Sequence, residues 1–126
     1  MEDAMDFSRM IETVKEHPDY HKMGMIASHL GVVRENSLKG GKVDEIELAF
    51  DEDTIQGIIR EAKRQPGIFE VLVETKGGRL KVGDEIMAVV VGGDTRDHVF
   101  PVLIETVEQM KKKASHKKEI FAGENK

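Results

Sequence analysis

The 126-residue chain contains no cysteine. This absence excludes disulfide bonds, thiolate metal sites and a cysteine nucleophile. No segment reaches the run of about 18 apolar residues that a membrane-spanning helix needs. The first residues, Met1 to Asp3, are acidic, unlike a signal peptide. We therefore expect a cytoplasmic protein that does not contact a membrane.

The balance of charge is acidic overall. Apolar residues make up 39% of the chain, charged residues 34%, and the net charge is −5. This composition is typical of a globular protein, and the length suits a single domain over residues 1–126 with frayed ends at 1–5 and 123–126. The negative charge argues against general nucleic-acid binding, and a basic-tail nucleic-acid binder is the weakest alternative.

Hydrophobic periodicity predicts interleaved helices and strands. Helices are expected at 6–17, from about 51–53 to 65, and from a start between Asp97 and Pro101. Strands are expected at 23–33, 43–50, 69–73 and 85–91, of which the first and last read as buried. Short hairpin-like spacing between 76 and 84 predicts an α+β fold with a mixed sheet.

The strand 85–91 ends at Gly92-Gly93, and the loop that follows presents Arg96. A strand, a glycine turn and a helix start often form an anion site, because free N–H groups and the helix dipole converge there. Arg34 ends the strand 23–33, and a guanidinium group suits phosphate and carboxylate equally. Each arginine could bind an anion or could be an ordinary surface residue. For Arg34 the surface interpretation is somewhat better, whereas for Arg96 the two interpretations are balanced.

Lysines crowd the C-terminal region at 111–113 and 117–118. Cations at a helix C-terminus favour the helix dipole, which accounts for Lys111 but less well for Lys117 and Lys118. A lysine held among other cations loses proton affinity and can act as an acid or base. The five histidines show no recognised metal spacing, so we expect no metal and no cofactor. His29, in an apolar strand, suits a packed core or a pocket wall.

Several motifs together resemble the large, catalytic subunit of molybdopterin synthase. They are Gly31-Val32-Val33-Arg34, Gly78-Arg79-Leu80-Lys81-Val82-Gly83-Asp84-Glu85, Thr95-Arg96-Asp97-His98-Val99-Phe100 and Lys117-Lys118-Glu119-Ile120-Phe121. The order and spacing of these motifs together carry the resemblance, which spans Phe7 to about Phe121. The resemblance implies an α/β hammerhead-like fold with an added β subdomain and a homodimer.

The resemblance also implies a function. A small ubiquitin-like carrier ending in Gly-Gly would bring a thiocarboxylate to the large subunit, which would transfer its sulfur to cyclic pyranopterin monophosphate and form molybdopterin. By position, Arg34 and Arg96 would hold the phosphate or the thiocarboxylate. Lys111 and Lys117 would act in proton transfer and charge stabilisation.

The chain departs from the family pattern at pocket positions. Thr95 replaces a histidine, His29 an aromatic residue and His116 a tryptophan, so these three are expected in the substrate site. The segment between Lys111 and Lys117 is about one residue short, which makes Lys118 an alternative to Lys117. These changes leave open a non-catalytic paralogue that binds a pterin or a ubiquitin-like partner.

Overall fold

A computed structural model describes residues 5–122 of the chain. In chain order the elements are α1 (Phe7–Lys15), a 3₁₀ turn (Tyr20–Lys22), β1 (Met25–Val32), β2 (Val43–Phe50), α2 (Glu52–Lys63), β3 (Ile68–Thr75), β4 (Gly78–Lys81), β5 (Glu85–Gly93), α3 (Arg96–Gln109), a π-helical turn (Met110–Ala114) and β6 (Ser115–Phe121). No helix among these residues is long and apolar enough to cross a membrane.

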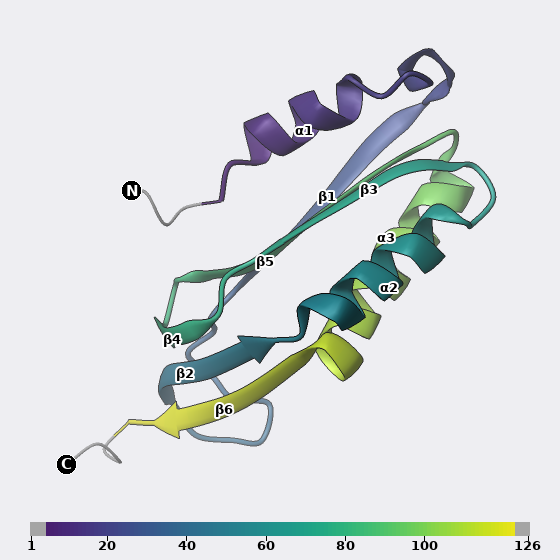
Figure 1. Cartoon of the computed structure of the whole chain (residues 1–126). Helices are drawn as coiled ribbons and strands as arrows, with labels where there is room; N and C mark the ends of the chain where they lie inside the picture. Colours follow the sequence, from purple (N-terminus) through teal and green to yellow (C-terminus); the bar gives the residue numbers. More distant parts are fainter. Residues whose placement is uncertain (1–4, 123–126) are drawn as a thin grey trace.

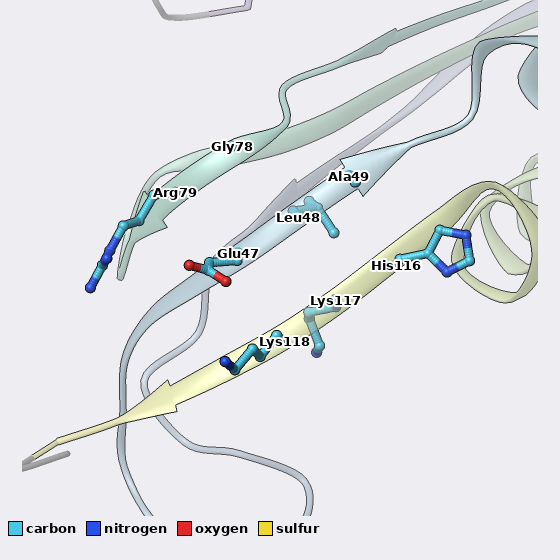
Figure 2. A pocket seen from close by; sticks show the side chains of 8 residues that line it. All are labelled: Glu47, Leu48, Ala49, Gly78, Arg79, His116, Lys117 and Lys118. Carbon is cyan, nitrogen blue, oxygen red and sulfur yellow. The ribbon is translucent and has the colours of Figure 1, made fainter. Parts of the chain in front are cut away.

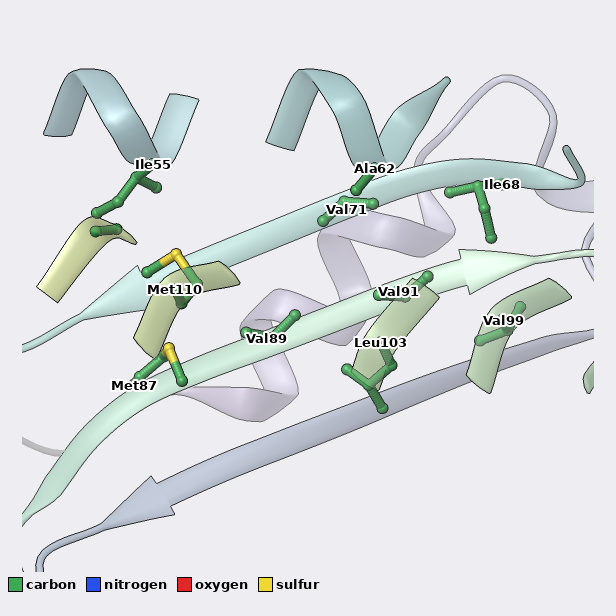
Figure 3. Packing of buried hydrophobic residues seen from close by; sticks show 11 residues of the cluster. Ile55, Ala62, Ile68, Val71, Met87, Val89, Val91, Val99, Leu103 and Met110 are labelled. Carbon is green, nitrogen blue, oxygen red and sulfur yellow. The ribbon is translucent and has the colours of Figure 1, made fainter. Parts of the chain in front are cut away.

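The first sheet has the strand order β1-β5-β3, with α1 on one face and α2 and α3 on the other (Figure 1). Its central strand, β5, is fully buried from Ala88 to Val91, which confirms the prediction from its apolar run. The larger core fills the space between this sheet and the two helices, where Val89 and Val91 meet Leu103 and Met110 (Figure 3). This core fixes the position of the end of α3.

The second sheet has the strand order β4-β2-β6 and packs around a smaller core. Strand β2 has the predicted bounds, 43–50. The prediction succeeded because the buried residues Ile46 and Leu48 alternate with more exposed ones, which gives the sequence a clear period of two. The sequence did not predict β6, whose residues 116–118 are all exposed and show no alternation. The hairpin-like segment at 76–84 instead provides β4, which pairs with β2.

The α+β class and the added β subdomain are confirmed, but the expected mixed sheet is wrong. Every strand pair in the described residues is antiparallel. The reason lies in the connections. Helix α2 joins β2 of the second sheet to β3 of the first, and α3 joins β5 to β6 in the opposite sense. Neither helix returns the chain to the same sheet, so neither creates the crossover that parallel pairing needs.

Three other expectations from the sequence, on the start of a helix, the burial of a strand and the order of the N-terminus, differ from the structure. Helix α3 begins at Arg96, after Thr95 in an extended conformation, so Arg96 lies in the first helical turn and not in the loop. Strand β1 is a half-exposed sheet edge and not a buried strand. Met5, expected to be frayed, donates its N–H to Glu85 at 2.7 Å and packs under α1. The remaining expected frayed residues, 1–4 and 123–126, lie outside the described residues.

Gly67 fits a narrow space between α2 and the start of α3. It has φ of +77°, and a Cβ there would lie 2.2 Å from Nδ1 of His98 and 2.3 Å from Oδ1 of Asp94. His98 and Asp94 are themselves joined by a 2.7 Å hydrogen bond, which lowers the pKa of Asp94. No side chain larger than hydrogen fits this backbone conformation and this space without displacement.

Gly67→Ala is therefore expected to lower the free energy of unfolding by about 1–3 kcal/mol, because both the backbone and the Asp94–His98 contact are strained. Gly57→Ala is the matched control, since the nearest atom to its Cβ would be the end of Arg60 at 3.8 Å. It should stabilise α2 by about 0.5–1 kcal/mol. Urea denaturation of both variants measures the difference, and equal effects would contradict this description of Gly67.

Candidate active site

The lysine cluster is carried by two consecutive elements. After α3, the chain makes the π-helical turn Met110–Ala114, in which Met110 and Ala114 are both 0% exposed. These two anchors leave Lys111 and its two lysine neighbours exposed. Strand β6 then begins at Ser115, whose hydroxyl donates to the Lys111 carbonyl. Single π-helical turns are frequent at functional sites, and this one presents three ammonium groups beside the strand that carries two more.

A pocket of about 460 Å³ lies over the second sheet (Figure 2). It is lined by Glu47, Leu48, Ala49, Gly78, Arg79, His116, Lys117 and Lys118. Side chains alternate along a strand, and cross-strand partners share a face. His116 and Lys118 therefore share a face with their partners Ala49 and Glu47, whereas Lys117 shares the other with Leu48. The structure thus separates the two candidate lysines that the sequence could not distinguish.

Charge is strongly segregated along the chain. Residues 34–50, 76–84 and 110–122, which form the second sheet and its connections, carry a net charge of +5, whereas the rest of the chain carries −10. We call these three segments the basic unit. A local positive field attracts anions even when the whole protein is negative. The net charge of −5 therefore conceals a surface suited to a phosphate or carboxylate.

His29 lies on β1 and faces the end of α3. It pairs with Val89, a residue of the core under α3, and its Nε2 is buried without a hydrogen-bond partner in the described part of the chain. Burial lowers the pKa of His29, and the positive charge of Lys111 lowers it further. His29 and Lys111 are therefore neighbours, and the imidazole is held in its neutral form. His29 does not line the pocket over the second sheet, so its expected place in the substrate site stays a prediction.

His29→Phe is expected to stabilise the protein, and more at pH 5 than at pH 8. At pH 8 the gain should be about 1 kcal/mol, because a buried nitrogen without a partner is removed. Because the pKa of His29 is lower in the folded state, the unfolded chain binds more protons below about pH 6.5 and wild-type stability falls there. The phenylalanine variant lacks this loss. Urea denaturation at both pH values measures it, and an equal gain at the two would contradict the neutral imidazole.

The two arginines expected to share one anion site lie apart. Arg34 is exposed just after β1, next to Val33, whose N–H donates to Asp84 at 2.9 Å. Arg96 and Thr95 are exposed at the start of α3. Lys111 follows Arg96 by fifteen positions, so a helical rise of about 1.5 Å per residue separates them by about 22 Å. Within one copy of the chain, Arg96 and Thr95 do not contact the same small ligand as Lys111.

Two charged residues that line the pocket, Arg79 and Glu47, were not among the candidates from the sequence. Arg79 stands on β4 and forms an ion pair with Glu45 of β2, and Glu47 lies on the same face of β2. Arg79 lies within the motif that starts Gly78-Arg79-Leu80, but at a position where the family pattern specifies no residue type. Its alignment opposite Glu47 depends on the pairing of β2 with β4, which the sequence did not indicate.

A family model described as MoaE protein matches residues 1–113. The chain belongs to the MoaE family. This family is the large, catalytic subunit of molybdopterin synthase, so the chain functions in molybdenum cofactor biosynthesis, as the sequence predicted. The match ends before β6, so it does not include His116, Lys117 or Lys118.

Solved structures show the same fold over nearly the whole chain. Molybdopterin synthase from Staphylococcus aureus has a TM-score of 0.77 at 21% identity, covering 94% of this chain and 87% of the other. A MoaE protein from Burkholderia ambifaria gives 0.73 at 25% identity, with 95% and 85% covered. A complex of subunits 1 and 2 of molybdopterin-converting factor from Helicobacter pylori gives 0.67 at 18%, with 97% and 87% covered. The curated proteins searched contain no significant match.

Proposed function

We propose that this MoaE-family chain transfers sulfur from a thiocarboxylated small carrier to cyclic pyranopterin monophosphate within its basic unit. The observation that supports this most is the cluster of Arg79, His116, Lys117 and Lys118 around an open pocket on an otherwise acidic protein, with Lys111 in the turn that leads into the same strand. Both the thiocarboxylate and the substrate phosphate are anions, which such a cluster attracts. The cytoplasmic location expected from the sequence stays a prediction.

The proposed roles divide between binding and chemistry. Arg34 and Lys111 hold the phosphate, because guanidinium and ammonium groups donate charge-assisted hydrogen bonds to phosphate oxygens. Lys117 moves the protons that sulfur transfer requires, and its neighbouring cations stabilise developing negative charge. Its ammonium group lies 3.9 Å from Glu119, a distant pairing that leaves it available to substrate. Lys118, on the opposite face of β6, serves the binding of anions at the pocket and not the chemical step.

A second copy of the chain completes the site in this proposal. Helix α3 buries Val99 and Leu103, yet Phe100 and Ile104 on another face are 46% and 63% exposed. An exposed apolar stripe of this kind is typical of a protein interface. Strand β1, which packs against α3, is also an open sheet edge with Leu30 and Val32 exposed.

A two-fold axis beside Ile104 would run α3 antiparallel to its copy. Because Ile104 lies midway between Arg96 and Lys111 in the sequence, the partner's Arg96 would then approach Lys111 of this chain. Arg96 and Lys111 are about 22 Å apart within one copy, but Arg96 of one copy would lie close to Lys111 of the other. The homodimer thus accounts for the placement of Arg96 and Thr95, which the single chain does not.

The carrier is proposed as a small ubiquitin-like chain ending in Gly-Gly, in line with the two-subunit complex formed by the Helicobacter pylori relative. Expression of the chain in a bacterial strain that lacks its own large subunit tests the function. We expect restored molybdoenzyme activity with the wild-type chain and none with Lys117→Ala. Thr95, at the place of the family histidine, favours the alternative of a non-catalytic paralogue, which predicts no restoration although the carrier is bound.

A further inference from the structure

Helix α3 and the π-helical turn after it carry two opposite charges that have no partner within one copy. Among residues 5–122, the Asp97 carboxylate makes no side-chain hydrogen bond or ion pair, and the Lys111 ammonium group has no carboxylate beside it. Both residues are exposed. By contrast, Glu105 on the same helix accepts a hydrogen bond from Gln109 at 2.6 Å. The charges of Asp97 and Lys111 are therefore free for contacts outside the single chain.

Asp97, Ile104 and Lys111 lie on one exposed stripe. Successive members are seven residues apart, which is about two turns at 3.6 residues per turn, so each step drifts by only about 20° around the axis. The backbone stays right-handed helical through Met110, with φ of −58° and ψ of −44°, so helical geometry also places Lys111. An acidic, an apolar and a basic residue thus follow one another along the exposed face of α3.

This stripe is complementary to an inverted copy of itself. A two-fold axis beside Ile104 runs α3 antiparallel to its copy, so Asp97 of each copy faces Lys111 of the other. At a rise of about 1.5 Å per residue, both contacts lie about 10 Å from the axis. A parallel arrangement would instead bring each charge next to its own copy, which is repulsive. The order of charges therefore favours the antiparallel interface.

We propose that Asp97 of one copy pairs with Lys111 of the other and positions its ammonium group at the shared site. This inference rests on the proposed function and adds a positioning residue to it. Asp97 follows Arg96 directly and stands where the family pattern specifies no residue type, so the pairing is particular to this chain. The second copy thus contributes a carboxylate to the site as well as a guanidinium group.

Lys111 is surrounded by like charges that such a carboxylate would offset. Lys112 and Lys113 follow it in the π-helical turn, and Arg96 of the second copy approaches it in the proposed dimer. Repulsion among these cations drives their long side chains apart. An ion pair with Asp97 holds one ammonium group in place before the phosphate arrives, so less rotamer freedom remains to be lost on binding.

Charge reversal tests the pairing without substrate or carrier. In an Asp97→Lys homodimer both contacts join two ammonium groups, and in a Lys111→Asp homodimer both join two carboxylates. Each variant should therefore dimerise at least about tenfold more weakly than the wild type. In a heterodimer of the two variants both contacts again join opposite charges, so its affinity should return to within about threefold of wild type. Sedimentation velocity with one variant fluorescently labelled measures these affinities.

Glu105→Lys is the matched control. It makes the same charge change on the same helix, but Glu105 lies about 100° around the axis from Ile104. Its homodimer should keep the wild-type affinity, and it should not rescue Lys111→Asp. Rescue by Glu105→Lys as strong as rescue by Asp97→Lys would show general charge attraction and overturn the pair. A mixture of Asp97→Lys and Lys111→Asp that associates no better than either variant alone would also overturn it.

The positioning role has a readout of its own. At protein concentrations where the dimer is complete, Asp97→Asn should raise the KM for cyclic pyranopterin monophosphate about fivefold and leave the single-turnover rate at saturation near that of the wild type. Asp97→Glu keeps the charge and should recover most of the loss. A lower KM in Asp97→Asn would show that the carboxylate only repels the phosphate, and would overturn the positioning role.

The outcomes separate this inference from the proposed function. Product formation by the wild-type chain without rescue in the charge-reversed mixture would retain sulfur transfer and overturn the pair of Asp97 and Lys111. Rescue of the dimer without product from the wild-type chain would support the pair and contradict the sulfur transfer. A wild-type chain that stays monomeric in the presence of substrate and carrier would overturn the pair.

Discussion

Replacement of Lys117 by alanine should lower the rate of sulfur transfer by about 10²–10⁴-fold, the range expected when a positioned acid–base group is lost. Lys117 lies on an exposed strand, so the fold should be unaffected. Single-turnover conversion of cyclic pyranopterin monophosphate, with the carrier in excess, measures the effect on the chemical step. Carrier affinity should remain near that of the wild type.

Lys118→Ala is the matched control for this prediction. Lys118 is adjacent, also exposed and identical in chemistry, but its side chain lies on the opposite face of β6. Its loss should raise the concentration of anionic substrate needed for half-maximal rate. The single-turnover rate at saturating substrate should stay within about threefold of the wild-type rate, because the lost interaction binds substrate and transition state equally. A wild-type rate in Lys117→Ala with a collapse in Lys118→Ala would show that the catalytic lysine was assigned to the wrong face.

Mixing two inactive variants should restore activity if the site is shared between copies. Arg96→Ala and Lys111→Ala each damage both sites of a homodimer. In a mixed dimer related by a two-fold axis, one site carries both defects and the other carries none. Random exchange makes about half the dimers mixed, so about a quarter of wild-type activity should return. Conversion measured before and after subunit exchange tests this.

A mixture of Lys111→Ala and Lys117→Ala provides the control. These lysines are six positions apart at the same end of the chain and belong to the same half of the site. Every mixed dimer then carries a defect in both sites, so no recovery is expected. Recovery in this control, or its absence in the Arg96 and Lys111 mixture, would contradict the placement of the two-fold axis beside Ile104.

The sequence predicted those elements whose burial follows a simple period. The bounds of β2 followed from its alternation, and β5 was recognised because every residue from Ala88 to Val91 is buried. Strand β6 was missed for the opposite reason. As an edge strand of a small sheet it is exposed on both faces at Lys117 and Lys118, so it carries no hydrophobic period. Its position depends on pairing with β2, a contact distant in sequence.

In the candidate site too, the residue types could be predicted from the sequence but their spatial grouping could not. The lysines and arginines were identified from residue type and from the resemblance to the family. Their grouping was not, because it depends on which strand pairs with which. Arg79 joins the pocket through the β2–β4 ladder, and Arg96 is removed from it by the length of α3. The mixed sheet was wrongly expected because helices between strands suggest a crossover, whereas here each helix changes sheets.

Conversion in vitro tests the central claim most directly. The purified chain would be mixed with a thiocarboxylated carrier and cyclic pyranopterin monophosphate, and the dithiolene product followed as its oxidised fluorescent derivative. The account predicts product with the wild-type chain and almost none with Lys117→Ala. A wild-type chain that binds the carrier tightly and forms no product would contradict it, and would show that the basic unit kept its docking surface without the chemistry.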